Sequence, residues 1–289
     1  MEVHTGRQIE AEAFKELQRK NWQRAAAHWR KYDEQLCRNG AAITARLLEL
    51  ASIQSGHRVL DIASGTGEPG LPAARIAGPS GFVLLTDQSP EMLAVARDKA
   101  NAQGLHNVDF RVSDAEQLQL DPESFDAALW RGSLMLMPDP VRCLRLVYES
   151  LKPGGRIAVQ VVGRPEANPY FTIPRTVLRK YVSLPHYDPT APGIFAFANP
   201  DRLRSVLARA GFCELHIEHV ESTSQLEGAS GREYWEYMRE GSFVAALLAK
   251  IPADQHEKIG EEIAAKACGG DAGGKVELLC ESILAAGVR

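Results

Sequence analysis

Short apolar strands alternate with helices over the middle of the chain, between about residues 57 and 163. Five segments have the apolar content of buried strands, at residues 59–62, 81–87, 108–112, 125–130 and 155–162. Two of the intervening helices have clear start signals, at Ser89-Pro90 and at Pro140, and run to residues 100 and 151. Strands that alternate with helices favour a parallel sheet, so we expect the carboxyl ends of all five strands along one edge.

Helical segments flank this core on both sides. Before it, residues 8–35 carry apolar side chains at helical spacing, and residues 41–51 form a second helix. After it come a proline-punctuated stretch with a helix at 170–181, a helix at 200–210, a sixth strand at 214–220, an insertion with helices at 232–250 and 253–267, and a last strand at 281–288. We therefore expect an N-terminal helical cap at 1–52, an α/β core at 53–229, a helical lid over the acceptor pocket at 230–270 and a final core strand within 271–289.

The first strand runs directly into a glycine-rich loop, and together they read VLDIASGTGEPG over residues 59–70. Glycine allows a tight turn and lets backbone N–H groups approach a ligand closely. One interpretation is a strand-to-helix turn without a ligand. Another is dinucleotide binding, because Gly65, Gly67 and Gly70 have the spacing G-x-G-x-x-G and Asp87 follows about 20 residues later.

Acidic residues stand at three of the predicted strand ends. Asp61 lies inside the end of the first strand, Asp87 ends the second and Asp114 follows the third. Since ligands of such sheets bind at the carboxyl ends of the strands, Asp87 is placed to hold a ribose and Asp114 to meet an adenine edge. Asp61 and Asp114 fit a nicotinamide site poorly, which favours a different nucleoside cofactor.

Residues 57–163 resemble the class I S-adenosylmethionine-dependent methyltransferases through five motifs. These are VLDIASGTGEPG, TDQSPEML, SDAEQL, FDAALWRGSLMLMPDP and LKPGGRIAVQVV. The resemblance is closer to the menaquinone/ubiquinone C-methyltransferase-like branch. It implies a Rossmann-like sheet of seven strands whose last strand is antiparallel, and S-adenosylmethionine as cofactor with S-adenosylhomocysteine as product. The family loop more often has Gly and Cys or Thr where this chain has Ala63-Ser64, a mild change that still allows the turn.

The resemblance also implies a set of cofactor-binding residues. The methionine end of the cofactor would contact Asp61, Ser64, Gly65, Thr66 and Gly67, and the ribose would contact Asp87 and Gln88. The adenine would lie against Met92, Ser113, Asp114 and Ala115. Arg131 would lie at the mouth of the site, and an aromatic cover would consist of Trp29 and Tyr32. For Trp29 and its neighbour Trp22 the alternative is plain core packing, because an aromatic stripe on a helix usually faces a core.

The activity implied is methyl transfer to a small or medium-sized, apolar or aromatic acceptor. A sulfonium is already electrophilic, so alignment of the acceptor suffices and no nucleophilic residue is required. Arg131 could orient an acceptor carbonyl, or it could instead form an ion pair within the protein. His186 or Tyr170 could take a proton from the acceptor, although His186 could also be a loop histidine without a chemical role. The residues predicted to wall the acceptor pocket are Phe171, Ile173, Tyr181, Phe195, Phe197, Trp235 and Tyr237. An NAD(P)-dependent dehydrogenase and an S-adenosylmethionine-binding protein without methyl transfer stay open as alternatives.

Charge and composition narrow the partners. The 289 residues carry a net charge of −4 with a pI near 6.1, so neither a nucleic acid nor another polyanion is expected. The five cysteines are widely spaced without a CxxC pair, which predicts neither disulfides nor a metal site. No apolar run reaches the roughly 18 residues of a membrane helix, and the N-terminus lacks a signal sequence. We expect a cytoplasmic protein without a membrane span, and a homodimer is compatible with the sequence.

Overall fold

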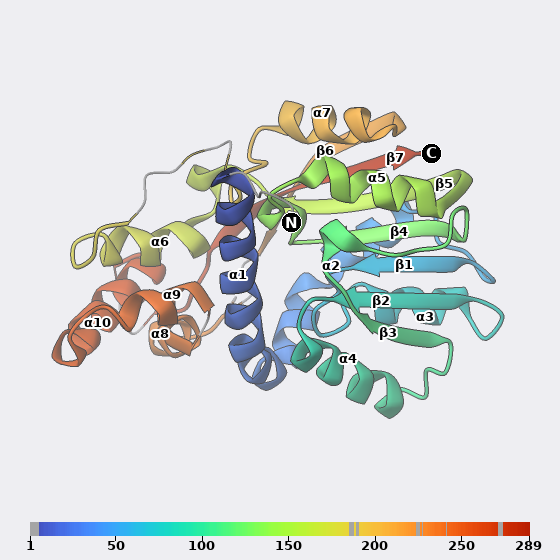
Figure 1. Cartoon of the computed structure of the whole chain (residues 1–289). Helices are drawn as coiled ribbons and strands as arrows, with labels where there is room; N and C mark the ends of the chain where they lie inside the picture. The colour runs from blue at the N-terminus through green and yellow to red at the C-terminus, as the bar shows by residue number, and fades with distance from the viewer. Residues whose placement is uncertain are drawn as a thin grey trace.

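A seven-stranded mixed sheet forms the body of the protein. The computed structural model describes residues 6–184, 188, 191–223, 226, 228–240, 242–270 and 274–289. Within these residues the strand order is β3-β2-β1-β4-β5-β7-β6 (Figure 1). The strands are β1 (Arg58–Ile62), β2 (Phe82–Asp87), β3 (Val108–Val112), β4 (Phe125–Arg131), β5 (Leu151–Val162), β6 (Cys213–Thr223) and β7 (Leu279–Val288). Strands β1 to β5 pair in parallel, and β7 runs antiparallel to both β5 and β6. The predicted α/β fold is confirmed.

Helices cover both faces of the sheet. On one face α2, α3 and α4 enclose a core with β1 and β2, and on the other α5 and α7 enclose a core around the fully buried Trp130. The helices of this body are α2 (Asp33–Leu50), α3 (Gly70–Ala77), α4 (Pro90–Ala102), α5 (Pro140–Ser150) and α7 (Pro200–Ala210), with short 3-10 turns η1 (Ala115–Gln117), η2 (Leu134–Leu136) and η3 (Pro165–Ala167). Because both faces are covered, the central strands are apolar on both sides.

Side-chain caps explain why two of these helices begin where the sequence predicts. Before α4, Ser89 Oγ accepts a hydrogen bond from the N–H of Met92 at 3.2 Å, and Pro90 occupies the first turn. Before α7, Asn199 Oδ1 accepts from the N–H of Asp201 at 2.9 Å. Such caps satisfy backbone donors that have no partner inside the helix. The cap at Ser89 also starts α4 directly after β2, which brings Met92 to the carboxyl edge of the sheet.

The N-terminal helices differ from the prediction. Helix α1 (Gly6–Lys31) ends before Tyr32, and α2 continues through residues 36–40, where the sequence predicts a break. Gly40 lies inside α2, and a Cβ atom at this position would collide with the guanidinium of Arg131. The glycine therefore serves a close approach between α2 and the end of β4 and does not terminate the helix. In Figure 1, α1 crosses the carboxyl edge of the parallel strands.

A second group of helices lies beside the sheet, on the far side of α1 (Figure 1). It consists of α6 (Pro169–Leu178), α8 (Gly231–Glu240), α9 (Ser242–Leu248), the short turn η4 (Ala253–Gln255) and α10 (His256–Ala267). The helix predicted over 232–250 corresponds to α8 and α9, which lie on either side of position 241, outside the described residues. Tyr234 and Trp235 of α8 form the centre of this group with Tyr170, Val177 and Leu178 of α6. The insertion between β6 and β7 thus packs behind α6.

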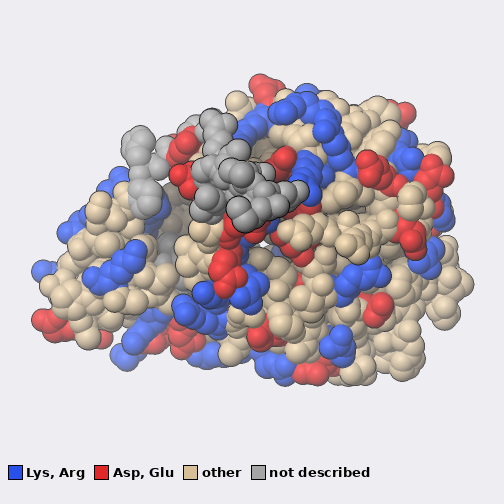
Figure 2. All heavy atoms as spheres, viewed as in Figure 1, with Lys and Arg blue, Asp and Glu red and all other residues tan. Residues whose placement is uncertain are grey.

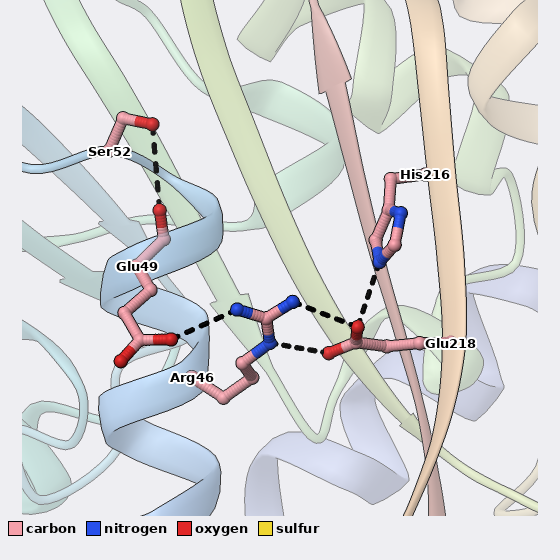
Figure 3. Close-up of polar contacts among 5 residues, drawn as sticks. All are labelled: Arg46, Glu49, Ser52, His216 and Glu218. Carbon is pink, nitrogen blue, oxygen red and sulfur yellow. Dashed lines mark hydrogen bonds and ion pairs between the residues drawn. The ribbon is translucent and has the colours of Figure 1, made fainter.

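An ion-pair cluster ties α2 to the edge strand β6 (Figure 3). Arg46 of α2 donates two hydrogen bonds to Glu218 of β6, at 2.7 and 2.9 Å, and a third to Glu49 at 2.9 Å. His216 Nε2 lies 2.8 Å from the same Glu218 carboxylate. The hydrogen bonds from Arg46 lower the pKa of Glu218 to about 2. The paired charges hold the N-terminal helices against the far edge of the sheet.

The surface carries charges of both signs. On the face drawn in Figure 2, Lys and Arg side chains are interspersed with Asp and Glu side chains. Such a surface has no extended basic stripe on that face, as a site for the phosphates of a nucleic acid would need. Among the helices in the described ranges, we find none with both the length and the apolar character of a membrane span.

Candidate active site

One cavity of about 300 Å³ opens at the carboxyl ends of the parallel strands. Its near end lies at the ends of β1, β2 and β3 under α1, and its distal end lies between α6 and the first residues of β7. The predicted site residues that line it are Trp29, Ser64, Gly65, Thr66, Asp87, Gln88, Met92, Ser113, Asp114, Ala115, Arg131 and Tyr170. Residues more than a hundred positions apart therefore meet in one space.

Asp87 anchors the glycine loop to the end of β2. Its Oδ2 accepts a hydrogen bond from the N–H of Gly65 at 2.9 Å, and its Oδ1 accepts one from the N–H of Ser89 at 2.8 Å. Burial raises the pKa of Asp87, and the N–H groups of Ser89, Gly65 and Gln88 oppose that rise. Each carboxylate oxygen keeps a further lone pair, so the group can also accept hydrogen bonds from a bound diol.

Asp61 and Gly67 shape the loop from beneath and do not line the cavity. The Asp61 carboxylate is completely buried, and burial raises its pKa well above the usual range. The N–H of Gly70 opposes the rise, but it makes no hydrogen bond of ordinary geometry, and both carboxylate oxygens lack a partner among the described residues. A Cβ at Gly67 would lie 2.8 Å from Leu71. At Gly65, which does line the cavity, a Cβ would meet nothing within 4 Å.

Asp114 already has a charged partner, Lys15 of α1. Lys15 Nζ lies 2.9 Å from Asp114, 3.1 Å from Glu116 and 2.7 Å from Glu12. Burial lowers the pKa of Lys15, but its hydrogen bonds to the three carboxylates outweigh this and raise it. Asp114 also caps the short turn η1, where Oδ1 accepts from the N–H of Glu116 at 2.9 Å. The ion pair holds α1 over the near end of the cavity.

Aromatic side chains of α1 cover part of the near end. The rings of Trp22 and Trp29 meet edge to face, with centroids 6.1 Å apart, and both residues line the cavity. They pack against Met92, so core packing and cavity lining are combined in the same residues. Tyr32 is not part of this cover. Its ring packs instead on Tyr237, with centroids 4.8 Å apart, outside the cavity wall.

Arg131 has internal partners at the mouth of the site. Its Nη1 donates to Thr44 Oγ1 at 2.9 Å and lies 3.9 Å from Glu68, and Thr44 donates to the same Glu68 at 3.0 Å. Burial lowers the pKa of Arg131, and the charge of Glu68 opposes this. The positive charge of the guanidinium thus faces Glu68 inside the protein, in agreement with the alternative that Arg131 forms an ion pair. The residue also lines the cavity.

Helix α2 contributes site residues that the sequence motifs did not indicate. Asp33, Cys37 and Gly40 line the cavity between the glycine loop, where Glu68 also lines it, and Arg131. Asp33 Oδ1 accepts hydrogen bonds from Lys99 at 2.8 Å and from Thr66 at 3.3 Å, while burial raises the pKa of Cys37 to about 11. Positions 33, 37, 40 and 44 recur at helical spacing on one face of α2, a signal that could have been found.

The distal end of the cavity is formed differently from the prediction. Of the predicted aromatic wall, only Phe171 lines it, because the other residues are buried in the packing behind α6 or beneath the sheet. Within the described residues, no side chain of α8, α9 or α10 reaches the cavity, so the insertion supports α6 from behind. Burial raises the pKa of Tyr170 well above the usual range, which opposes its predicted action as a base. His186 lies outside the described residues.

Metal binding finds no support in the part of the chain that the structure covers. Among those residues, no three His, Cys, Asp or Glu side chains gather as the ligands of an ion. The cavity instead combines a glycine loop, acidic strand ends and an apolar compartment, the parts expected of a nucleoside cofactor beside an organic molecule.

A family model described as a methyltransferase domain matches residues 53–180. The chain is also similar to the ubiquinone/menaquinone biosynthesis C-methyltransferase UbiE of Pseudomonas aeruginosa, with 38% identity over 122 residues, which are 42% of this chain and 48% of that enzyme. The chain therefore spans about half the length of the UbiE relatives that it matches.

Solved structures share the fold of this chain. The [4+2]-cyclase SpnF is 25% identical, with a TM-score of 0.53 over 85% of this chain and 80% of that one. Phosphoethanolamine N-methyltransferase 2 of Haemonchus contortus, solved in complex with S-adenosyl-L-methionine, is 20% identical, with a TM-score of 0.51 over 86% and 52% of the two chains. The predicted resemblance is confirmed: residues 53–180 match a methyltransferase domain and resemble the UbiE branch of the class I S-adenosylmethionine-dependent methyltransferases.

Proposed function

We propose that this protein transfers the methyl group of S-adenosylmethionine to a small or medium-sized, largely apolar organic acceptor. The observation that carries the proposal is the two-part cavity. Gly65, Asp87 and Asp114 stand at the ends of three neighbouring strands in its near part, and Phe171 and Ile194 give its distal part an apolar wall. UbiE is a C-methyltransferase of quinone biosynthesis, which supports an aromatic or quinone-like acceptor here.

The near part of the cavity has suitable groups for each portion of the cofactor. Asp87 would accept hydrogen bonds from the ribose hydroxyls through its remaining lone pairs, and Asp114 with the backbone of Ala115 would hold the adenine edge. Asp33 and Glu68 would face the ammonium group of the methionine. Ser64 Oγ, which has no hydrogen-bond partner within the described ranges, offers one more polar contact on the glycine loop.

The reaction needs alignment more than chemical catalysis. Bound S-adenosylmethionine supplies a methyl carbon that an acceptor lone pair or carbanion attacks as the carbon–sulfur bond breaks, and its electron pair stays on sulfur. The chain's own residues would hold the acceptor in line and exclude water beneath α1. Such positioning is worth about 7–11 kcal/mol. A hydroxyl or carbon acceptor must also lose a proton. The raised pKa of Tyr170 keeps it a hydrogen-bond donor, and His186 stays a predicted base.

A second candidate function is a reaction other than methyl transfer in the same site. It is favoured by the similarity to SpnF, a [4+2]-cyclase. A fold does not dictate the reaction that its site performs. In that case the protein would bind the cofactor, but no methyl group would reach an acceptor.

Two measurements test the proposal in sequence. S-adenosylhomocysteine should raise the melting temperature, by a stabilisation of about 2.7 kcal/mol at one hundred times its dissociation constant, whereas NADH should have no effect. A methyl-deuterated donor is then incubated with aromatic, quinol and polyketide-like acceptors, and products are identified by mass. Labelled product that is lost in the Asp87→Ala variant supports methyl transfer. Binding without labelled product would favour the cyclase-type function, and stabilisation by NADH would contradict the site assignment.

A further inference from the structure

Most polar groups in the distal part of the cavity already have partners. Glu281 is held by Arg164, whose Nη2 lies 2.9 Å from one carboxylate oxygen, and by His219 at 3.3 Å. Gln160 Nε2 donates to Ser282 Oγ at 3.0 Å. The carboxylate of Glu281 is therefore neutralised within the protein, and the remaining wall is mainly apolar.

Asn168 is the exception in this wall. It is 1% exposed, and its Nδ2 donates hydrogen bonds to the backbone carbonyls of Arg164 at 2.8 Å and Glu281 at 3.1 Å. Carbonyls only accept hydrogen bonds, so these two contacts settle which end of the amide is nitrogen. Its Oδ1 is buried and has no hydrogen-bond partner among the described residues.

The unpartnered oxygen has no role in the local helix. Asn168 precedes α6, where an Asn side chain ordinarily accepts a hydrogen bond from the first turn. Here the side chain makes no such bond, and its backbone carbonyl accepts from the N–H groups of Phe171 and Thr172 instead, at 3.1 and 3.2 Å. A buried acceptor without a donor is costly, so it indicates a partner that arrives from outside the chain.

We propose that Asn168 is a specificity-determining residue that accepts a hydrogen bond from an O–H or N–H group of the methyl acceptor. This inference rests on the proposed function. Because the oxygen is uncharged and Glu281 beside it is already paired, the expected class is a neutral, largely apolar molecule with a donor, such as a phenol or an enol. The atom is enclosed in the structure, so neighbouring side chains of the wall must shift as the donor enters.

Phenol and anisole test this because anisole carries a methoxy group in place of the O–H donor of phenol. With S-adenosylhomocysteine bound, each is titrated into the isotope-labelled protein while the side-chain amide of Asn168 is followed by NMR. We expect phenol to shift this amide and to bind about tenfold more tightly than anisole, as one buried hydrogen bond allows. Benzoate, which is anionic, should bind more weakly than phenol.

The Asn168→Ser variant should reduce the preference for phenol to about twofold or less, since it replaces the amide oxygen by a hydroxyl on a shorter side chain and keeps a residue suited to a helix start. The same replacement at the exposed Asn101 of α4 is the matched control and should leave the preference unchanged. If Asn168→Ser does not fold, the wild-type titration decides alone. Equal binding of phenol and anisole, a preference for benzoate or no binding of phenol would overturn the inference and leave a structural water as the partner. Failure of S-adenosylhomocysteine itself to bind would instead overturn the proposed function.

Discussion

Replacing Asp87 with alanine should lower both the stability of the protein and its affinity for the cofactor, and the two effects can be measured separately. In the free protein Asp87 accepts hydrogen bonds from Gly65 and Ser89, at 2.9 and 2.8 Å, and only 8% of the residue is exposed. Its removal leaves two largely buried N–H groups unpaired, which costs about 1–3 kcal/mol each. Water admitted to the vacated space would recover part of this. We therefore expect the free energy of unfolding to fall by about 2–4 kcal/mol.

The same variant loses the acceptor for the ribose. Two hydrogen bonds to a charged group contribute about 1.5–3 kcal/mol each, so S-adenosylhomocysteine should bind at least about tenfold more weakly. Wild-type affinity should also fall at acidic pH, as protons neutralise a carboxylate whose pKa is raised by burial. Urea unfolding measures the first effect and calorimetry the second.

The matched control is Asp109→Ala, which removes an exposed carboxylate from the neighbouring β3. It should change neither quantity appreciably. An Asp87→Ala variant with wild-type affinity would refute the ribose assignment, whereas wild-type stability would refute the reasoning that the carboxylate anchors the loop.

Three further predictions concern contacts around the site. Lys15→Met removes the ion pairs that hold α1 to Asp114 and Glu116. The dissociation rate of S-adenosylhomocysteine, measured by stopped flow, should therefore increase several-fold. An unchanged rate would mean that the tryptophans of α1 alone hold the helix in place. Glu218 has a pKa of about 2, below its usual value, so its stabilising ion pair should be complete above about pH 5 and lost as the pH falls toward 2. The difference in unfolding free energy between the wild type and Glu218→Gln should therefore fall by about 1 kcal/mol on acidification. The ion pair contributes less than its pKa shift alone implies, because the Arg46 side chain is 39% exposed and solvent screens its charge. The exposed Glu221 of the same strand, replaced in the same way, should give no such pH-dependent difference. Tyr234→Phe removes a buried hydrogen bond of 2.8 Å to the Tyr170 carbonyl and should lower the unfolding free energy by about 1 kcal/mol, with cofactor affinity unchanged; a weaker affinity would show that α8 acts on the near part of the cavity.

The motif-bearing half of the site could be predicted because its residues lie next to strand ends. Gly65, Asp87 and Asp114 each directly follow or end a parallel strand, so the fold alone brings them together. The partners of those residues could not be predicted in the same way. Lys15 pairs with Asp114, 99 positions away in the chain, and nothing in the sequence near either residue indicates the other.

Gly40 illustrates the same limit for local structure. Beside Asn39 it has the sequence of a helix end, yet α2 continues through it, and Arg131 occupies the space where a side chain would stand. The tyrosine at position 32 was predicted to cover the cofactor and packs on Tyr237 instead, a contact that depends on an insertion encoded about two hundred residues later. The cytoplasmic location and the homodimer stay predictions of the sequence.

The position of β7 has a consequence for how the molecule is made. This strand lies between β5 and β6, but the ribosome delivers it only after α6 to α10. Until β7 is made, the backbone N–H and C=O groups on one edge of β5 are unpaired and β6 has no neighbouring strand. Such unpaired edges readily form hydrogen bonds with other chains. Cys280 to Ser282, which line the cavity, arrive with the same strand. The growing chain can therefore complete its sheet and the distal part of its cavity only after β7 has been made.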